Sequence, residues 1–435
     1  MTSEVGPARS STPPVTTEPG SSGPAAAPAG AASAGKNRNR HHKVLVIGGG
    51  NAGISLAARL RRYGVSDIAV VEPSSRHLFQ PLFSHIGGGT AEASEAVRPQ
   101  SSVMPKGVTW IQDSAVDIQP ESNAVALASG AQLSYGHVVV CPGLQLDWDK
   151  VPGLGESMES PHGSSNYVYE LASKTWTLLS GLRRGTVVFT MPSGPVKCGG
   201  AAQKPMYLAC DYWRQQGVLK DIRVVLVVPT PTVYGVPGVD EELNRKIAEY
   251  GIELRCNSEL VGVDANVRTA LVRDLLTGAT ESLPYDVLHA VPPQSAPDWL
   301  KATVLPAAGD DGGFVEVDPE TLRHLRYPNV WSLGDAAGTR NSKAGAALRK
   351  QTSVLAKNLK SVLRGGNPQA KYNGYSACPF TVSRSTVVFA EFDDQYRPMP
   401  SIPKVHVAKE RHSTWVLERD LFPGIYWNLI LKGRA

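Results

Sequence analysis

The sequence predicts an α/β protein with two parallel-sheet units and a C-terminal region. Residues 43–47 have the pattern of a buried strand, and the glycine-rich turn 48–53 follows them and opens a helical pattern. A second strand-like run, residues 186–190, also leads into a glycine-containing turn, residues 192–200. A strand, a glycine turn and a helix in this order are typical of Rossmann-like units, so we expect two of them.

Composition places the chain among globular proteins of two or three domains. The 435 residues are 42% hydrophobic and 19% charged, with a net charge of +5. No run of basic residues resembles a nucleic-acid patch, so no nucleic-acid partner is expected. Five cysteines are too few for a structural disulfide scaffold, and we expect any bridge to be redox-active. No run approaches the roughly 20 apolar residues of a membrane span. A cytoplasmic protein, at most peripheral on the membrane, is predicted.

The chain is expected to divide into five segments. Residues 1–41 are rich in Ser, Thr, Pro, Ala and Gly without apolar periodicity, and they are expected to be disordered. Residues 42–151 are predicted to start a dinucleotide-binding domain, and residues 152–310 to form the second Rossmann-like domain. The first domain is expected to resume over 311–370, before a C-terminal region over 371–435 with an aromatic end.

The first glycine turn has the spacing of a dinucleotide site. Gly48 allows the tight turn, Gly50 lets the backbone approach a pyrophosphate, and Gly53 lets the helix pack closely on the strand. Glu72 ends the next strand, 19 residues after Gly53, where it can accept hydrogen bonds from ribose hydroxyls. Because all these features occur together, a glycine-rich turn without a ligand is disfavoured.

A distant aspartate favours FAD over NAD as the ligand of this site. Asp335 follows a short strand pattern, and FAD enzymes often place an aspartate there to bind the ribityl and phosphate region. The alternative is that Asp335 is an ordinary helix N-cap, and the two roles are compatible.

The second unit lacks the requirements for a nicotinamide dinucleotide. Its turn, residues 192–200, has no Gly-x-Gly-x-x-Gly, and its next strand, residues 224–228, ends at Pro229 without an acid. An NADH-oxidising enzyme is therefore the less favoured hypothesis.

Two cysteines are candidates for electron transfer to a flavin. Cys198 has Lys197 beside it and a helix pattern close behind, and both features lower a thiol pKa. Cys378 precedes Pro379 in a loop-like context, 180 residues away, and the sequence alone does not show whether the two meet. The alternative for any cysteine is a small buried hydrophobe. We apply it to Cys141, Cys210 and Cys256.

Several stretches of the chain resemble one known family. They are Arg76–Pro81, Pro195–Leu208, Arg326–Asn329, Gly334–Asp335, Tyr372–Pro379, Ala390–Asp393 and Tyr426–Asn428. From about His42 onward the chain resembles sulfide:quinone oxidoreductase, in the branch that includes the animal mitochondrial enzymes. The resemblance implies a flavoprotein with two Rossmann-like domains and non-covalent FAD.

The resemblance also implies a reaction and a set of site residues. Cys198 and Cys378 would form the redox pair, bridged directly or through extra sulfur, beside the flavin ring. Hydrogen sulfide would leave a persulfide on Cys378, and two electrons would pass through FAD to a quinone. The sulfur would leave to a small acceptor such as sulfide, glutathione or sulfite. Residues implied to contact FAD are Gly50, Asn51, Glu72, Gln80, Ala115, Asp335, Lys343 and Ala344.

Two departures from the family keep alternatives open. The chain ends at Ala435, where the animal members continue with an apolar tail, and Arg349 and Lys350 add charge to a helix that is mostly small and apolar in the family. The aromatic end is expected either to dock in a lipid interface or to close the core. Its residues are Trp415, Leu421, Phe422, Ile425, Tyr426, Trp427, Leu429 and Ile430. The alternative functions are a persulfide-binding sensor without turnover and an NADH:quinone reductase.

Overall fold

A computed structural model of the protein describes residues 40–401 and 408–435. Within them, the first sheet has seven strands in the order β5-β2-β1-β8-β7-β6, with β19 also paired to β8. Their bounds are β1 (Arg40–Ile47), β2 (Ile68–Val71), β5 (Val108–Ile111), β6 (Ala115–Gln119), β7 (Ala124–Leu127), β8 (Gln132–Val140) and β19 (Val330–Ser332). The predicted disordered tail, residues 1–41, lies outside the described residues except for its last two, Arg40 and His41. For these two the prediction is wrong, because they begin β1.

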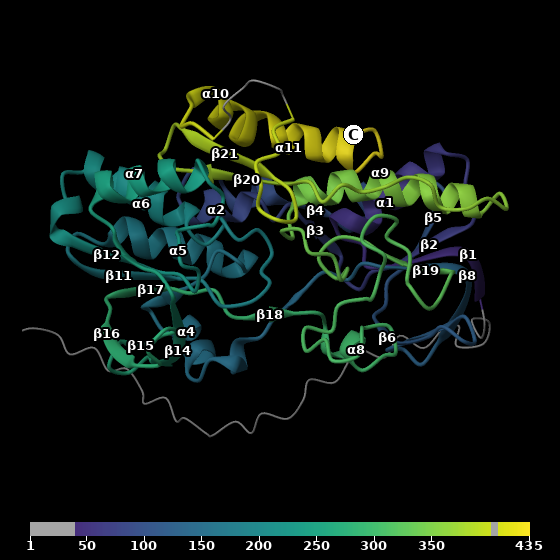
Figure 1. The fold of residues 1–435 in the computed structure, drawn as a ribbon, viewed down its shortest axis with the longest axis horizontal. Helices are drawn as coiled ribbons and strands as arrows, with labels where there is room; N and C mark the ends of the chain where they lie inside the picture. Colours follow the sequence, from purple (N-terminus) through teal and green to yellow (C-terminus); the bar gives the residue numbers. More distant parts are fainter. Residues whose placement is uncertain (1–39, 402–407) are drawn as a thin grey trace, which may run out of the picture. The chain divides into compact units, whose positions relative to one another are not determined.

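Two long helices cover one face of this sheet. They are α1 (Asn51–Arg62) and α9 (Gly345–Val362), which lie side by side in Figure 1. Leu56 and Leu60 of α1 pack with Leu355 and Leu359 of α9 against the apolar side chains of β1 and β2. The packing places the N-terminus of α1 at the carboxyl ends of β1 and β2, because β1 and β2 run parallel.

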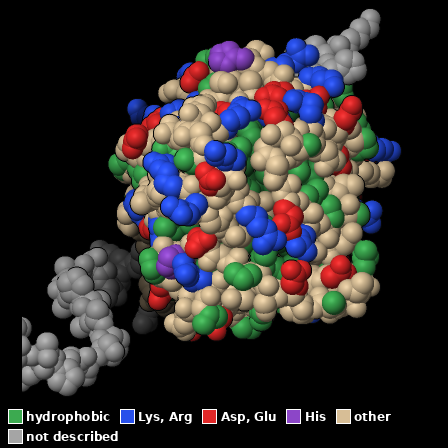
Figure 2. Space-filling view, turned by 90° about the vertical axis from the view of Figure 1, so that its left-hand side faces the viewer, with side chains coloured by type: hydrophobic (Ala, Val, Ile, Leu, Met, Phe, Trp, Pro, Cys, Tyr) green, Lys and Arg blue, Asp and Glu red, His purple; other side chains and the backbone are tan. Residues whose placement is uncertain are grey.

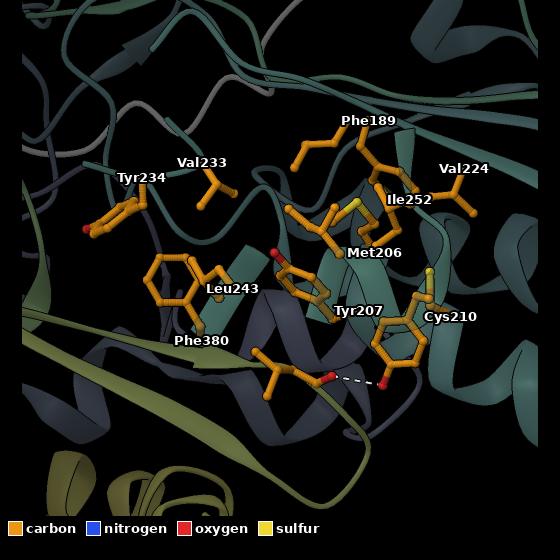
Figure 3. Close-up of a cluster of buried hydrophobic side chains, with 14 of the residues drawn as sticks. Phe189, Met206, Tyr207, Cys210, Val224, Val233, Tyr234, Leu243, Ile252 and Phe380 are labelled. Carbon is orange, nitrogen blue, oxygen red and sulfur yellow. Dashed lines mark hydrogen bonds between the residues drawn. The ribbon is translucent and has the colours of Figure 1, made fainter. Parts of the chain in front are cut away.

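The first sheet is mixed, because β7 pairs antiparallel with β6 and β8. The second sheet is parallel throughout and follows the order β10-β17-β11-β12-β13. Its strands are β10 (Gly163–Ser164), β11 (Gly185–Thr190), β12 (Ile222–Val227), β13 (Glu253–Arg255) and β17 (Val287–His289), with helices α5 (Tyr169–Gly181), α6 (Lys204–Gln215) and α7 (Val239–Tyr250). Figure 3 shows the core of this unit, where Phe189 of β11 and Val224 of β12 lie near Met206 of α6. The predicted class, α/β with two Rossmann-like units, is confirmed.

The C-terminal region joins both units. The hairpin β20 (Ser376–Thr381) and β21 (Val387–Phe392) contributes Phe380 to the core of the second unit (Figure 3). A helical run then continues through α10 (His412–Trp415), the π-helical η4 (Val416–Leu421), α11 (Phe422–Ile425) and the π-helical η5 (Tyr426–Ile430). Tyr426 and Trp427 pack with Ile54 of α1, so this run also holds the first unit.

Shorter elements complete the described chain. They are β3 (Arg76–Leu78), α2 (Leu82–Gly87), η1 (Ala93–Ala96), β4 (Val97–Pro99), α3 (Gln100–Val103), β9 (Gln145–Leu146), η2 (Trp148–Lys150), α4 (Leu154–Glu159), η3 (Leu219–Asp221), β14 (Ser258–Asp264), β15 (Thr269–Asp274), β16 (Thr280–Pro284), β18 (Gln294–Ser295) and α8 (Asp298–Lys301). No helix among the described residues has both the length and the apolar character needed to cross a bilayer. On the face drawn in Figure 2, basic and acidic side chains are interspersed.

Candidate active site

The glycine turn between β1 and α1 is built as the spacing predicts. Gly48 has a φ of +105°, a conformation that side chains disfavour. A Cβ at Gly53 would lie 1.9 Å from the Gly48 carbonyl oxygen, so only glycine lets α1 approach the turn this closely. A Cβ at Gly50 would have no neighbour within 4 Å, and Gly50 supplies no side-chain cap to α1. The turn therefore presents a helix N-terminus to open space, which fits an anionic pyrophosphate.

Glu72 lies beside this turn at the carboxyl end of β2. Its Oε2 accepts a hydrogen bond of 2.7 Å from the Gly49 N–H, and its Oε1 accepts one of 2.8 Å from the Ser74 N–H. Each carboxylate oxygen can accept a further hydrogen bond, so the predicted interaction with ribose hydroxyls is compatible with these contacts. Asn51, in the first turn of α1, hydrogen-bonds Ser55, and Ala115 is buried at the start of β6.

Asp335 lies in a turn after β19, and its proposed role as a helix N-cap is wrong. The helix α9 begins only at Gly345, and Ala344 occupies the capping position. Within the described residues no group hydrogen-bonds the Asp335 carboxylate. Burial raises its pKa, and the nearby charges of Lys343 and Lys197 oppose that effect. A half-buried carboxylate without a protein hydrogen-bond partner fits the predicted hydrogen bond to a ribityl hydroxyl of FAD.

Lys343 supplies the second charge of this region. Its ammonium donates a hydrogen bond of 3.0 Å to the Ala337 carbonyl and lies 4.1 Å from the centre of the Phe314 ring. Burial lowers the pKa of Lys343 to about 8, although Asp335 opposes the shift. The region therefore holds a buried cation and a half-buried carboxylate that a bound polar group can bridge.

The two candidate thiols meet. Cys198 Sγ lies 3.6 Å from Cys378 Sγ, although the residues are 180 positions apart. Cys198 adopts a φ of +49°, and its N–H donates a hydrogen bond of 2.6 Å to the Lys343 carbonyl, which ties the thiol loop to the Asp335 region. A Cβ at Gly200 would lie 2.5 Å from Cys378 Sγ, so this glycine makes room for the pair.

The expected loop around Cys378 is wrong, because Cys378 lies within β20. It pairs with Ala390 of β21, and the next residue, Pro379, pairs with Phe389. A proline has no N–H to donate to a sheet ladder. Among the described strands β20 pairs only with β21, so it is an edge strand, where a proline is tolerated.

The pair is electrostatically asymmetric. The hydrogen bond from the Cys378 thiol, together with the charge of Lys204, lowers the pKa of Cys198 to about 7 against the effect of burial. The same hydrogen bond and burial raise the pKa of Cys378 well above its usual value. This asymmetry favours the thiolate on Cys198 and the proton on Cys378 in the reduced pair.

The lysine that acts on Cys198 is Lys204, and the expected role of Lys197 is wrong. The Lys197 ammonium instead donates a hydrogen bond of 2.9 Å to Gln80 Oε1. Lys204 is the first residue of α6, is buried, and forms an ion pair of 3.1 Å with Glu418 of η4. Glu418 in turn lies 3.7 Å from His85 Nε2. Sequence reasoning missed Glu418 because 214 residues separate it from Lys204.

Comparison with known proteins adds to this geometry. The family model "Pyridine nucleotide-disulphide oxidoreductase" matches residues 42–177. The chain is 38% identical over 395 residues to "Sulfide:quinone oxidoreductase, mitochondrial" of Mus musculus, covering 90% of this chain and 87% of the relative. The chain belongs to the sulfide:quinone oxidoreductase family. The protein of the same name from Dictyostelium discoideum is 35% identical, with coverage of 90% and 86%.

The sulfide:quinone oxidoreductase family resemblance is thus confirmed, and with it FAD as the cofactor. The solved structure of the sulfide:quinone oxidoreductase from Aquifex aeolicus matches with a TM-score of 0.74 at 20% identity. That match covers 89% of this chain and 92% of the other, and it supports the shared fold.

Within this sulfide:quinone oxidoreductase fold, the aromatic end divides between two environments. Tyr426 and Trp427 are 2% and 4% exposed and close the core, whereas Leu421 and Leu429 are 52% and 39% exposed. Arg349 and Lys350 of α9 point to solvent, and the next residue, Gln351, is buried and accepts a hydrogen bond from the Gly334 N–H.

Proposed function

We propose that this protein oxidises hydrogen sulfide at the Cys198–Cys378 pair and passes the electrons through FAD to a quinone. The contact of 3.6 Å between the two sulfur atoms carries this proposal, because a disulfide can form between them with only side-chain motion. The unequal pKa values of the pair assign each sulfur a different task.

The first step is a thiol–disulfide exchange. Hydrosulfide attacks Cys378 Sγ of the oxidised pair, a new S–S bond forms there, and the Cys198–Cys378 bond breaks. Cys198 leaves as the thiolate because the thiol of lower pKa is the better leaving group. The products are a persulfide on Cys378 and a thiolate on Cys198, with Lys204 as the buried cation that favours the negative charge.

The second step returns the pair to its oxidised form. A nucleophilic acceptor takes the outer sulfur of the persulfide and leaves Cys378 as a thiolate. Closing the disulfide from two thiolates then releases two electrons. When bound, FAD supplies the two-electron acceptor for this oxidation and the two-electron donor for a quinone. Gly48, Gly50, Asn51, Gly53, Glu72, Gln80, Ala115, Asp335, Lys343 and Ala344 are the residues we propose to hold it.

The sulfur acceptor, membrane contact, location and domain limits belong to the same proposal. Small nucleophiles such as sulfide, glutathione and sulfite are the proposed acceptors, and initial rates with each compare them. The exposed Leu421 and Leu429 are the proposed lipid contacts, tested by co-sedimentation with vesicles.

The relatives named above are mitochondrial proteins by name, and cell fractionation tests the cytoplasmic location proposed here. We also propose that the FAD-binding domain spans residues 42–151 and 311–370, the second Rossmann-like domain 152–310, and the C-terminal region 371–435.

One anaerobic experiment tests the function. The purified yellow protein is mixed with sulfide and then with a short-chain quinone, while the flavin absorbance is followed. The proposal expects bleaching by sulfide and recovery with quinone. Bleaching by NADH but not by sulfide would instead favour an NADH:quinone reductase, and bleaching without recovery would favour a persulfide-binding protein.

A further inference from the structure

Two of the sequence stretches that carry the family resemblance meet at a buried hydrogen bond. Tyr426, in the C-terminal helical run, donates a hydrogen bond of 2.6 Å to Nε2 of His77 in β3. The residues are 349 positions apart and each is 2% exposed. The Tyr426 ring also stacks on Phe79, with centroids 4.2 Å apart. This contact has no role in the sulfide oxidation proposed above.

The contact continues to the dinucleotide turn through one further side chain. His77 Nδ1 lies 3.1 Å from Gln100 Oε1, and Gln100 Nε2 donates a hydrogen bond of 2.8 Å to the Gly49 carbonyl. Gln100 is 1% exposed. Burial lowers the pKa of His77, so its ring is neutral and can donate at Nδ1 while it accepts at Nε2. Every hydrogen bond of the series therefore points from Tyr426 toward Gly49, an arrangement in which each bond strengthens the next.

We propose that Tyr426, His77 and Gln100 are positioning residues that hold the Gly49 carbonyl, and so orient the Gly50 N–H toward the phosphates of FAD. The peptide unit between Gly49 and Gly50 is planar and trans, so fixing its carbonyl fixes the opposite direction of its N–H. The inference rests on FAD binding and is independent of which donor reduces the flavin.

The surroundings of Gly49 support this role. A Cβ at Gly49 would lie 2.6 Å from Gln100 Nε2 and 2.6 Å from the Glu72 Cβ, so both side chains close tightly on the turn. The Gly49 N–H is held by Glu72 Oε2 at 2.7 Å. The N–H and the carbonyl of Gly49 are thus both held by side chains, those of Glu72 and Gln100. Tyr426, from the C-terminal helical run, is the outermost residue of the series that ends at the carbonyl.

The test compares two tyrosine variants of the full-length holoenzyme. Tyr426→Phe removes the hydroxyl but keeps the ring stacked on Phe79. Tyr250→Phe is the matched control, because its buried hydroxyl donates a hydrogen bond of 3.0 Å to the Val382 carbonyl, in the second unit. The Kd of FAD is measured from the recovery of flavin fluorescence on serial dilution. We expect Tyr426→Phe to weaken FAD binding about fivefold and Tyr250→Phe to leave it unchanged. Equal Kd values in the two variants would overturn the proposal.

Variants at His77 provide a second measurement should Tyr426→Phe fold poorly. His77→Asn retains an amide N–H that can donate to Gln100, whereas His77→Leu retains no donor. Partial rescue is expected, with His77→Asn binding FAD more tightly than His77→Leu. Matching Kd values for the two His77 variants would contradict a hydrogen-bonded series, whatever their effects on thermal stability.

Discussion

Cys198 Sγ and Cys378 Sγ lie 3.6 Å apart because the second Rossmann-like unit and the C-terminal region pack together. The turn after β11 supplies Cys198, and the C-terminal hairpin supplies Cys378. The hairpin is fixed by Phe380, which is buried in the core of the second unit. The contact is therefore a property of the packed fold and not of a local motif.

Gly200 is expected to be essential to this contact. Gly200→Ala would place a methyl group 2.5 Å from Cys378 Sγ, whereas Gly199→Ala meets no atom closer than 3.6 Å. We predict that Gly200→Ala slows disulfide closure and sulfide turnover roughly tenfold or more, because small displacements of reacting atoms are costly. Gly199→Ala should behave like the wild type. Thiol counting during reoxidation measures both, and similar rates for the two variants would contradict the prediction.

Lys204 is expected to set the thiolate character of Cys198. Lys204→Met removes a charge that lowers the pKa of Cys198, so the midpoint of alkylation in the reduced protein should move above 7. A rise of about one unit would slow alkylation at pH 7 about fivefold, because the thiolate fraction falls by that factor. Lys197→Met is the control and should leave the midpoint in place. An unchanged midpoint in Lys204→Met would show that Lys204 does not lower the pKa of Cys198.

The persulfide is expected on Cys378. Cys198 has the lower pKa of the pair and is the better leaving group, so hydrosulfide should bond to Cys378 Sγ. The oxidised protein is mixed anaerobically with one equivalent of sulfide, without glutathione or sulfite, and is alkylated rapidly. Peptide mass spectrometry then locates the extra sulfur. If the extra sulfur is found mainly on the Cys198 peptide, Cys198 is the attacked sulfur and Cys378 the leaving thiolate, which would contradict the prediction.

Gly53 is expected to control FAD occupancy without touching the thiols. A methyl group at Gly53 would lie 1.9 Å from the Gly48 carbonyl oxygen, a backbone atom that cannot move without opening the turn. Gly53→Ala should therefore lose most of its flavin, while Gly155→Ala, which enters open space, should keep it. The ratio of flavin to protein after purification measures this. Full occupancy in Gly53→Ala would show that the turn is not the FAD site.

Local patterns predicted the elements that carry the nucleotide site. The strand expected over 186–190 is β11, which begins one residue earlier at Gly185, because one apolar run defines it. The turn after β1 was predictable since Gly48 needs a positive φ and Gly53 packs against the Gly48 carbonyl. The helix after Asp335 was expected immediately, but nine residues intervene before Gly345, because Asp335 sits in a turn that follows β19.

The same local patterns could not predict contacts between residues that are far apart in the sequence. Pro379 suggested a loop around Cys378, since proline is disfavoured within sheets, and only the two-stranded pairing of β20 explains its place in a strand. Lys197 was preferred to Lys204 because it neighbours Cys198 in sequence. A charge acts through space, and the negative charge of Glu418 holds Lys204 protonated near the pair against the effect of burial.

The central claim is that both thiols relay electrons from sulfide to the flavin. Rapid mixing of sulfide with Cys198→Ser, Cys378→Ser and the control Cys256→Ser, each loaded with FAD, tests it most directly. Both active-site variants should keep their flavin yet fail to bleach at the wild-type rate, while Cys256→Ser should bleach normally. Wild-type bleaching in either Cys198→Ser or Cys378→Ser would contradict the account.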